Sequence, residues 1–133
     1  MTRAQLIDYT ANWVVNRKST LYKEQVKYCQ AWLLKRDFND VTVVQSYSTY
    51  VAIFSHVTGT LYVFDNYSNT TCQHIRKAAK TLNADRIIWL YRRRDNLIEV
   101  DCHTGKGWKL TSQEFQSVHK LDYSTYIEDK AFR

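Results

Sequence analysis

The spacing of apolar residues changes along the chain, and each change predicts a different kind of element. Near the start, Leu6, Tyr9, Trp13 and Val14 recur at helical intervals, which predicts a helix capped by Thr2. After a polar run at residues 16–20, the same periodicity resumes and continues to about Arg36. It is carried by Tyr22, Val26, Cys29, Trp32 and Leu33. We therefore expect a helical hairpin or one long kinked helix, with Arg17, Lys18, Lys23 and Lys27 on its polar side.

From residue 41 onward β-branched and aromatic residues dominate, which predicts strands. The expected strands cover residues 41–44, 50–54, 61–64, 87–91 and 97–102, with a short sixth at 108–110. Gly59 tolerates a positive φ in the loop between the second and third strands, so these should form an antiparallel hairpin. A second hairpin is expected around Arg94, Asp95 and Asn96.

One strongly amphipathic helix is predicted between the two groups of strands. Thr70 and Gln73 have the spacing of a capping box, and the helix should run to about Leu82. Its inner stripe would be Ile75, Ala78, Ala79 and Leu82, and its basic outer face would be Arg76, Lys77 and Lys80. Thr111 and Glu114 form another capping box, which predicts a short helix carrying Phe115 and Val118. Residues 122–133 show no clear period, so an irregular or helical tail is expected.

This order of elements predicts an α+β fold, because it lacks the regular alternation of a parallel doubly wound sheet. We expect a mostly antiparallel sheet of five to six strands with helices on one face, preceded by an N-terminal helical segment. The 133 residues should form a single domain, with a helical segment at 1–37, a sheet-and-helix core at 41–121 and a tail at 122–133.

Composition narrows the class of protein further. Hydrophobic residues make up 44% of the chain, enough for a real core, and no stretch approaches the roughly 20 apolar residues of a membrane span. Residues 1–15 lack the pattern of a secretory signal. Cys29, Cys72 and Cys102 are odd in number and widely spaced, which suits a reducing compartment better than a disulfide framework. We therefore expect a cytoplasmic protein with no membrane attachment.

Positive charge is concentrated in one part of the chain. The formal net charge is +6, and residues 76–94 contain seven basic residues and one acidic residue. The run Arg92, Arg93 and Arg94 directly follows Trp89 and Tyr91 of the strand predicted at residues 87–91. Guanidinium groups suit phosphates, and aromatic rings suit bases.

Together with the basic helix face, these residues predict a surface for a nucleic-acid backbone. The alternative is that the arginines protect a hairpin end and pair with neighbouring acids. Those acids are Asp85, Asp95, Glu99 and Asp101.

Reactive chemistry is poorly represented among the sequence motifs. Cys72 with His74, and Cys102 with His103, lack the ligand spacing of a structural zinc site. Glu99 and Asp101 alternate as the carboxylates of a metal-dependent nuclease do, but such alternation also suits the solvated face of an edge strand. A nucleophile beside a histidine would have to be found in space. We expect no catalytic residues, no metal and no cofactor.

Three segments in the middle of the chain resemble a known family. Residues 46–53, 59–63 and 67–75 carry a motif of the form SYxT followed by YSxTTxxHI, and it is similar to one in a small family of uncharacterised proteins common in phages and mobile elements of Gram-positive bacteria. The resemblance implies a phage origin and a shared fold core, without an activity. Most of the motif also has a structural interpretation, with Ser68, Thr70 and Thr71 as caps, Tyr67 as a core anchor and His74 as a core residue.

Three functions follow as hypotheses. The first is a phage-type accessory protein that binds nucleic acid or a host nucleoprotein, in its narrowest form an anti-CRISPR-like inhibitor of a Cas effector. The second is an interaction or assembly module with tyrosine and tryptophan anchors, as a monomer or a homodimer. The third is a metal-dependent nuclease that uses Glu99 and Asp101.

Overall fold

The computed structural model describes residues 3–36, 40–65, 67–93, 96–100 and 107–111, and from Tyr91 onward it describes the backbone. The elements are α1 (Arg3–Asn16), β1 (Tyr22–Gln25), β2 (Ala31–Lys35), β3 (Val41–Ser46), β4 (Thr49–Ser55), β5 (Thr60–Val63), α2 (Asn69–Leu82), β6 (Arg86–Arg93), β7 (Asn96–Val100) and β8 (Gly107–Thr111). The predicted α+β fold with a mostly antiparallel sheet is confirmed. The expected helix after Thr111 and the tail at 122–133 lie outside the described residues.

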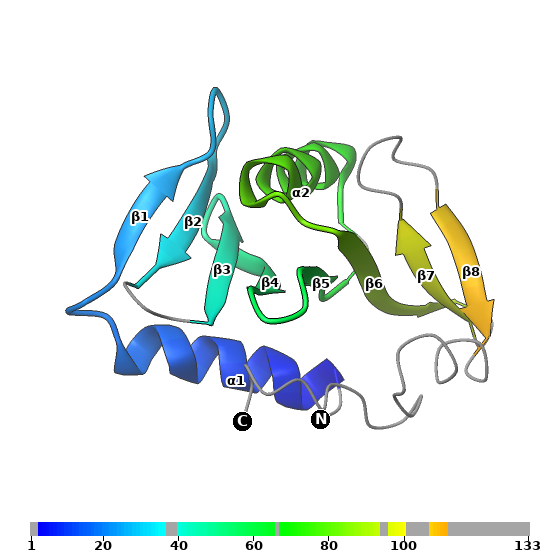
Figure 1. Ribbon diagram of the computed structural model, residues 1–133, viewed down its shortest axis with the longest axis horizontal. Helices are drawn as coiled ribbons and strands as arrows, with labels where there is room; N and C mark the ends of the chain where they lie inside the picture. Colours follow the sequence, from blue (N-terminus) through cyan, green and yellow to red (C-terminus); the bar gives the residue numbers. More distant parts are fainter. Residues whose placement is uncertain (1–2, 37–39, 66, 94–95, 101–106, 112–133) are drawn as a thin grey trace.

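The strands form one sheet in which spatial order follows chain order from β1 to β8 (Figure 1). All neighbours are antiparallel except β5 and β6, which are parallel because the chain crosses over through α2 between them. The strands β1, β3, β5 and β6 consequently run in the same direction. Their carboxyl ends, and the start of α2, therefore meet at one edge of the sheet, which we call the carboxyl edge.

The two helices cover opposite faces of the sheet (Figure 1). On the α1 face, Val43 and Ile53 pack with Trp13 of α1, whereas on the α2 face Val44 and Phe54 pack with helix residues of the other cluster. The prediction of helices on one face is corrected here, because the middle strands are apolar on both sides. Neither of the helices among the described residues is long and apolar enough to span a membrane.

Residues 22–35 form the hairpin β1–β2, so the prediction of a second helical run is wrong. The apolar residues there fit helical spacing, but Leu33 and Leu34 are adjacent and both completely or almost completely buried, on opposite faces of the sheet. A strand buries adjacent residues on opposite faces, whereas a helix would have turned both toward a similar side. The first helix is confirmed, with Leu6, Trp13 and Val14 buried.

Candidate functional site

Helix α2 is held at both ends by caps, which fixes the face that it presents to solvent. Ser68 is the N-cap, and its side chain accepts a hydrogen bond from the backbone N–H of Thr71 at 3.3 Å. The predicted capping box of Thr70 and Gln73 therefore does not start the helix, whereas the interpretation of Ser68 as a cap is confirmed. At the other end Asn83 adopts the left-handed conformation, with φ of 57°, and its N–H donates to the carbonyls of Ala79 and Lys80 in the last turn.

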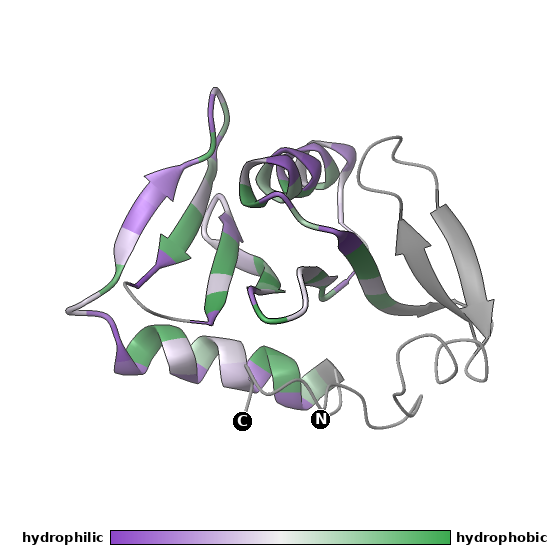
Figure 2. Cartoon of the chain, in the orientation of Figure 1, coloured by the Kyte–Doolittle hydropathy of each residue, from purple (hydrophilic) through white to green (hydrophobic). Residues whose placement is uncertain are grey.

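The inner side of α2 buries Ile75, Ala78 and Ala79 against the sheet, as predicted. Arg76, Lys77 and Lys80 are exposed on the outer side, and we call these three residues the basic face. Figure 2 shows the outer side of α2 as hydrophilic. The prediction that these cations share one surface is correct in its geometry.

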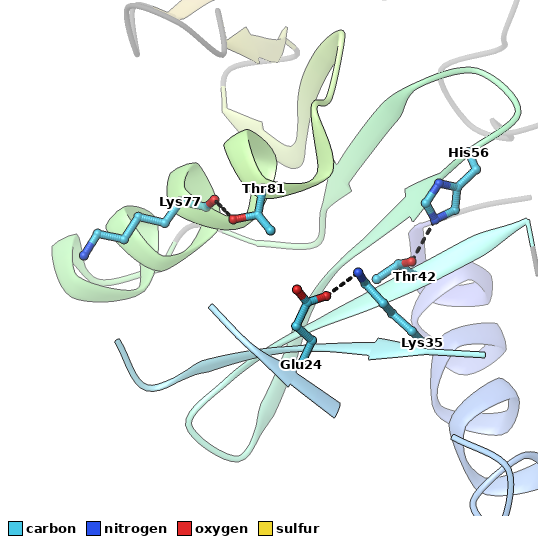
Figure 3. A network of polar contacts seen from close by, with 6 residues as sticks. All are labelled: Glu24, Lys35, Thr42, His56, Lys77 and Thr81. Carbon is cyan, nitrogen blue, oxygen red and sulfur yellow. Dashed lines mark hydrogen bonds and ion pairs between the residues drawn. The ribbon is translucent and has the colours of Figure 1, made fainter. Parts of the chain in front are cut away.

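No acidic residue lies on α2, and no residue of the basic face forms an ion pair with any other residue in the described part of the chain. Lys35 differs, since it pairs with Glu24 on β1 (Figure 3). In the same view, the contact drawn at Lys77 is made by its backbone carbonyl, which accepts from the Thr81 hydroxyl at 3.0 Å. The charges of the basic face are therefore available to a ligand.

A buried polar cluster fastens α2 to the carboxyl edge. The Ser46 Oγ atom lies 2.9 Å from His74 Nδ1 and 3.2 Å from Thr71 Oγ1. The ring of Tyr47 lies against the imidazole, with centroids 5.4 Å apart. Burial, and then the positive charge of Lys77, lower the pKa of His74 below its ordinary value of 6.5. The cluster joins the two halves of the motif, since its hydrogen-bond partners are 25 and 28 residues apart in the sequence.

The Ser46–His74 pair does not have the geometry of a nucleophile and its base. Ser46 is 2% exposed and His74 5% exposed, so a substrate has no path to the hydroxyl. No carboxylate among the described residues orients the imidazole. The pair instead serves as a hydrogen-bonded joint between β3 and α2.

A second polar group lies farther along the same face of the sheet (Figure 3). The Thr42 Oγ1 atom is 2.8 Å from His56 Nε2, and the His56 ring meets Phe54 edge to face at 4.8 Å. Burial lowers the pKa of His56, as does Lys35 more weakly, while Asp40 acts in the opposite direction. Because Lys35 is already paired with Glu24, this group adds no free cation to the surface.

The candidate metal-ligating residues can be compared where the structure describes their side chains. Among those residues no three His, Cys, Asp or Glu side chains come close enough to hold an ion. The thiol of Cys72 is directed to the carbonyl of Tyr67, and that of Cys29 to the carbonyl of Val26, each at 3.5 Å. Glu99 is on β7, where its backbone pairs with that of Ile88 on β6. Asp101, Cys102 and His103 lie outside the described residues.

Arg17 and Lys18 follow the end of α1, which covers the face opposite α2, so the structure does not bring them to the basic face. The Arg17 guanidinium lies 5.1 Å above the Trp13 ring and donates to the Trp13 carbonyl at 3.4 Å. Its Nε atom is buried without a hydrogen-bond partner. Arg17 thus acts as a packing residue at the end of α1, and Lys18 is exposed next to it.

Trp89 is 6% exposed, and its indole N–H donates to the Asp65 carbonyl at 2.7 Å. The prediction that this ring could stack on a base is wrong, because strand alternation turns Trp89 with Ile87 toward the core under α2. Tyr91, Arg92 and Arg93 continue β6 toward the carboxyl edge, and Arg94 lies outside the described residues.

The proposed pairing of these arginines with Asp85 is excluded by the strand itself. Asp85 precedes β6, where its N–H donates to the Gly59 carbonyl, and Arg92 lies seven positions farther along the chain. An extended chain covers roughly 23 Å over that interval. Asp85 therefore belongs to the opposite end of the strand.

Sequence reasoning did not identify two exposed tyrosines as turn residues. Tyrosine is a typical strand residue, and the two turns lack glycine. Tyr28 lies in the turn at residues 26–30 and Tyr47 in the turn at residues 47–48, and both have left-handed backbones, with φ of 63° and 53°. We call these two segments the tyrosine turns. The short spacer between strands around each tyrosine is the signal that could have revealed them.

The chain belongs to a family of unknown function, DUF8033, whose model matches residues 11–96. That range includes the tyrosine turns, the buried joint and the whole of α2. No curated protein and no solved structure matches the chain. The family relation thus covers the candidate site but supplies no activity for it.

Proposed function

We propose that this protein binds nucleic acid, with the basic face of α2 contacting phosphates. The observation that carries the proposal is the exposure of Arg76, Lys77 and Lys80 on one side of a helix that has no acidic residue. Guanidinium and ammonium groups gathered in this way attract a polyanion and release its counterions.

The rigidity of the helix favours the same proposal. Both caps and the Ser46–His74 joint hold α2 in one orientation, so the three cations are presented on a fixed support. Little ordering of the backbone is then required when a phosphate chain binds. The expected net charge of the whole chain, +6, adds long-range attraction to the same ligand.

The experiment is a salt series of binding to labelled nucleic acid, followed by fluorescence anisotropy. For single strands, log K falls with log[salt] by about 0.7 per phosphate contact, so three contacts alone give a fall of roughly 18-fold between about 50 and 200 mM. The variant Arg76→Gln/Lys77→Gln/Lys80→Gln should lose about two units of that slope.

The matched control is Lys18→Gln/Lys23→Gln/Arg36→Gln, which removes the same charge from exposed positions outside α2. It should leave most of the slope in place. Equal effects of the two triple variants would mean that net charge, and not the basic face, governs binding. Binding that does not change with salt would favour the alternative, a protein-interaction module with aromatic anchors.

The narrower hypothesis of a phage-encoded inhibitor of a Cas effector in the host cytoplasm stays a prediction. It rests on the motif resemblance and on the affinity of a basic surface for guide RNA or DNA. Its test is target cleavage by a purified RNA-guided nuclease. The wild-type protein should slow cleavage and the basic-face variant should not.

A further inference from the structure

Tyr28 and Tyr47 adopt a backbone conformation that bulky side chains rarely take. Turn positions with φ near 60° are usually filled by glycine or asparagine, as Asn83 shows in this chain. Strained backbone positions of this kind must be held in place by the surrounding structure, and they cluster at active sites and ligand-binding sites. Both tyrosines also lie at turns along the same carboxyl edge.

Neither ring is used to fill the core. Tyr28 is 88% exposed and Tyr47 is 54% exposed, so a folded chain gains little from their apolar surface. The rings are nevertheless braced from one side. Lys27 Nζ lies 5.1 Å from the centroid of the Tyr28 ring, and the His74 imidazole supports the Tyr47 ring.

The two tyrosine turns are tied to each other and to their strands. The Tyr47 N–H donates to the Gln30 carbonyl at 2.9 Å, which joins the turns directly. Gln25 Nε2 donates to the Cys29 carbonyl at 3.0 Å, and Gln45 Nε2 donates to the Tyr47 carbonyl at 2.6 Å. Counting along the chain through the Gln30 contact, the two tyrosine Cα atoms lie within about 14 Å of each other.

The tyrosine turns also adjoin the basic face. Tyr47 contacts His74, and Lys77 follows His74 by three residues, which places both on one side of adjacent helical turns. Lys27 adds a further cation beside Tyr28. The tyrosine turns and Lys27 thus meet the start of α2 at the carboxyl edge, and the basic face leads away from that edge along the exposed side of the helix.

We propose that the tyrosine turns and the basic face form one binding site for single-stranded nucleic acid. Tyr28 and Tyr47 stack on unpaired bases while Arg76, Lys77 and Lys80 contact the phosphates. This inference rests on the proposed function and specifies its ligand. A duplex keeps its bases stacked inside, so it would engage the cations without the rings, whereas single strands gain from both.

The test compares three ligands of one sequence, about 12 nucleotides long, in anisotropy titrations: single-stranded DNA, single-stranded RNA and duplex DNA. The variant is Tyr28→Asn/Tyr47→Asn, because asparagine tolerates the left-handed backbone and keeps both turns intact. Tyr22→Asn is the matched control, since Tyr22 is another exposed tyrosine but lies at the start of β1, away from the turns. Tyr28→Phe/Tyr47→Phe keeps both rings.

We expect the wild-type protein to bind either single strand more tightly than the duplex. Each stacked base contributes a factor of about 5 to 100, so the Asn double variant should lose at least about 25-fold in single-strand affinity. Its duplex affinity should be unchanged, and the Phe and Tyr22→Asn variants should bind as the wild type does. RNA and DNA affinities then separate the two sources of unpaired bases.

Two failures are distinguishable. If the basic-face variant abolishes salt-dependent binding while the Asn double variant binds single strands as the wild type does, the stacking inference is overturned and the proposed function stands. If no nucleic acid binds at about 50 mM salt, both are overturned. A wild-type protein that binds duplex and single strand equally also overturns the inference.

Discussion

Replacing Tyr28 with asparagine should stabilise the fold even though it removes an aromatic side chain. A bulky residue in the left-handed conformation costs about 1–2 kcal/mol, and asparagine relieves most of that cost. Tyr28 is 88% exposed, so its loss removes little burial. The contact that is lost is the cation–π interaction with Lys27, which contributes about 0.5 kcal/mol at an exposed site.

The net expectation for Tyr28→Asn is a gain of about 0.5–1.5 kcal/mol in the free energy of unfolding, or a few degrees in Tm. Chemical denaturation in guanidinium followed by circular dichroism measures it, since the midpoint should rise at constant m value. The same variant should bind single-stranded nucleic acid more weakly. Greater stability with weaker binding would show that the tyrosine is kept for its surface.

The reverse substitution at a matched position supplies the control. Asn83 ends α2 with φ of 57° and is exposed, so Asn83→Tyr should lower stability by about 1–2 kcal/mol. If Asn83→Tyr destabilises the protein but Tyr28→Asn does not stabilise it, the reasoning about strain at Tyr28 is refuted.

Two further predictions concern the support of α2. Because the pKa of His74 is lowered in the folded state, the unfolded chain binds the proton more readily, so stability should fall as pH drops below about 6.5 and level off below the folded pKa. The urea midpoint should depend less on pH across this range in the His74→Asn variant than in the wild type. The pKa of His56 is also lowered, so the His56→Asn variant measures its separate contribution. A pH dependence that is unchanged in both variants would contradict this prediction. Ser68→Ala should cost about 1 kcal/mol through loss of the N-cap, measurable as a lower Tm, whereas Ser68→Asn should restore it; equal Tm values for all three proteins would exclude a role for the cap.

The central part of the fold could be predicted because its residues agree at several levels. The inner stripe Ile75, Ala78 and Ala79 and the outer basic residues fit only a helical period, and α2 ends at Leu82 as expected. The strands from Val41 onward were recognisable from β-branched residues. Residues 41–44 are all buried, and their nearly continuous apolar sequence also indicates that both faces of the sheet are covered. A strand with one face in solvent would alternate between apolar and polar residues.

The hairpin at residues 22–35 was not predictable from spacing alone. Its apolar residues satisfy a helical period by chance. The turn between its two strands has Tyr28 in the left-handed conformation, where a glycine would have indicated a turn. Trp89 was predicted to be exposed because arginines follow it in the sequence. Alternation along the strand instead puts Trp89 on the same side as Ile87, in the core. The candidate site could not be predicted from the sequence, because the turns at Tyr28 and Tyr47 come together with α2 only in the folded chain.

The most direct test of nucleic-acid binding through α2 is a chemical-shift titration of the 15N-labelled protein with a short single-stranded oligonucleotide at low salt. The proposal predicts shifts at the backbone amides around Arg76, Lys77 and Lys80 and in the tyrosine turns, with α1 unaffected. Shifts confined to α1 and its following residues Arg17 and Lys18, or no shifts at all, would contradict it.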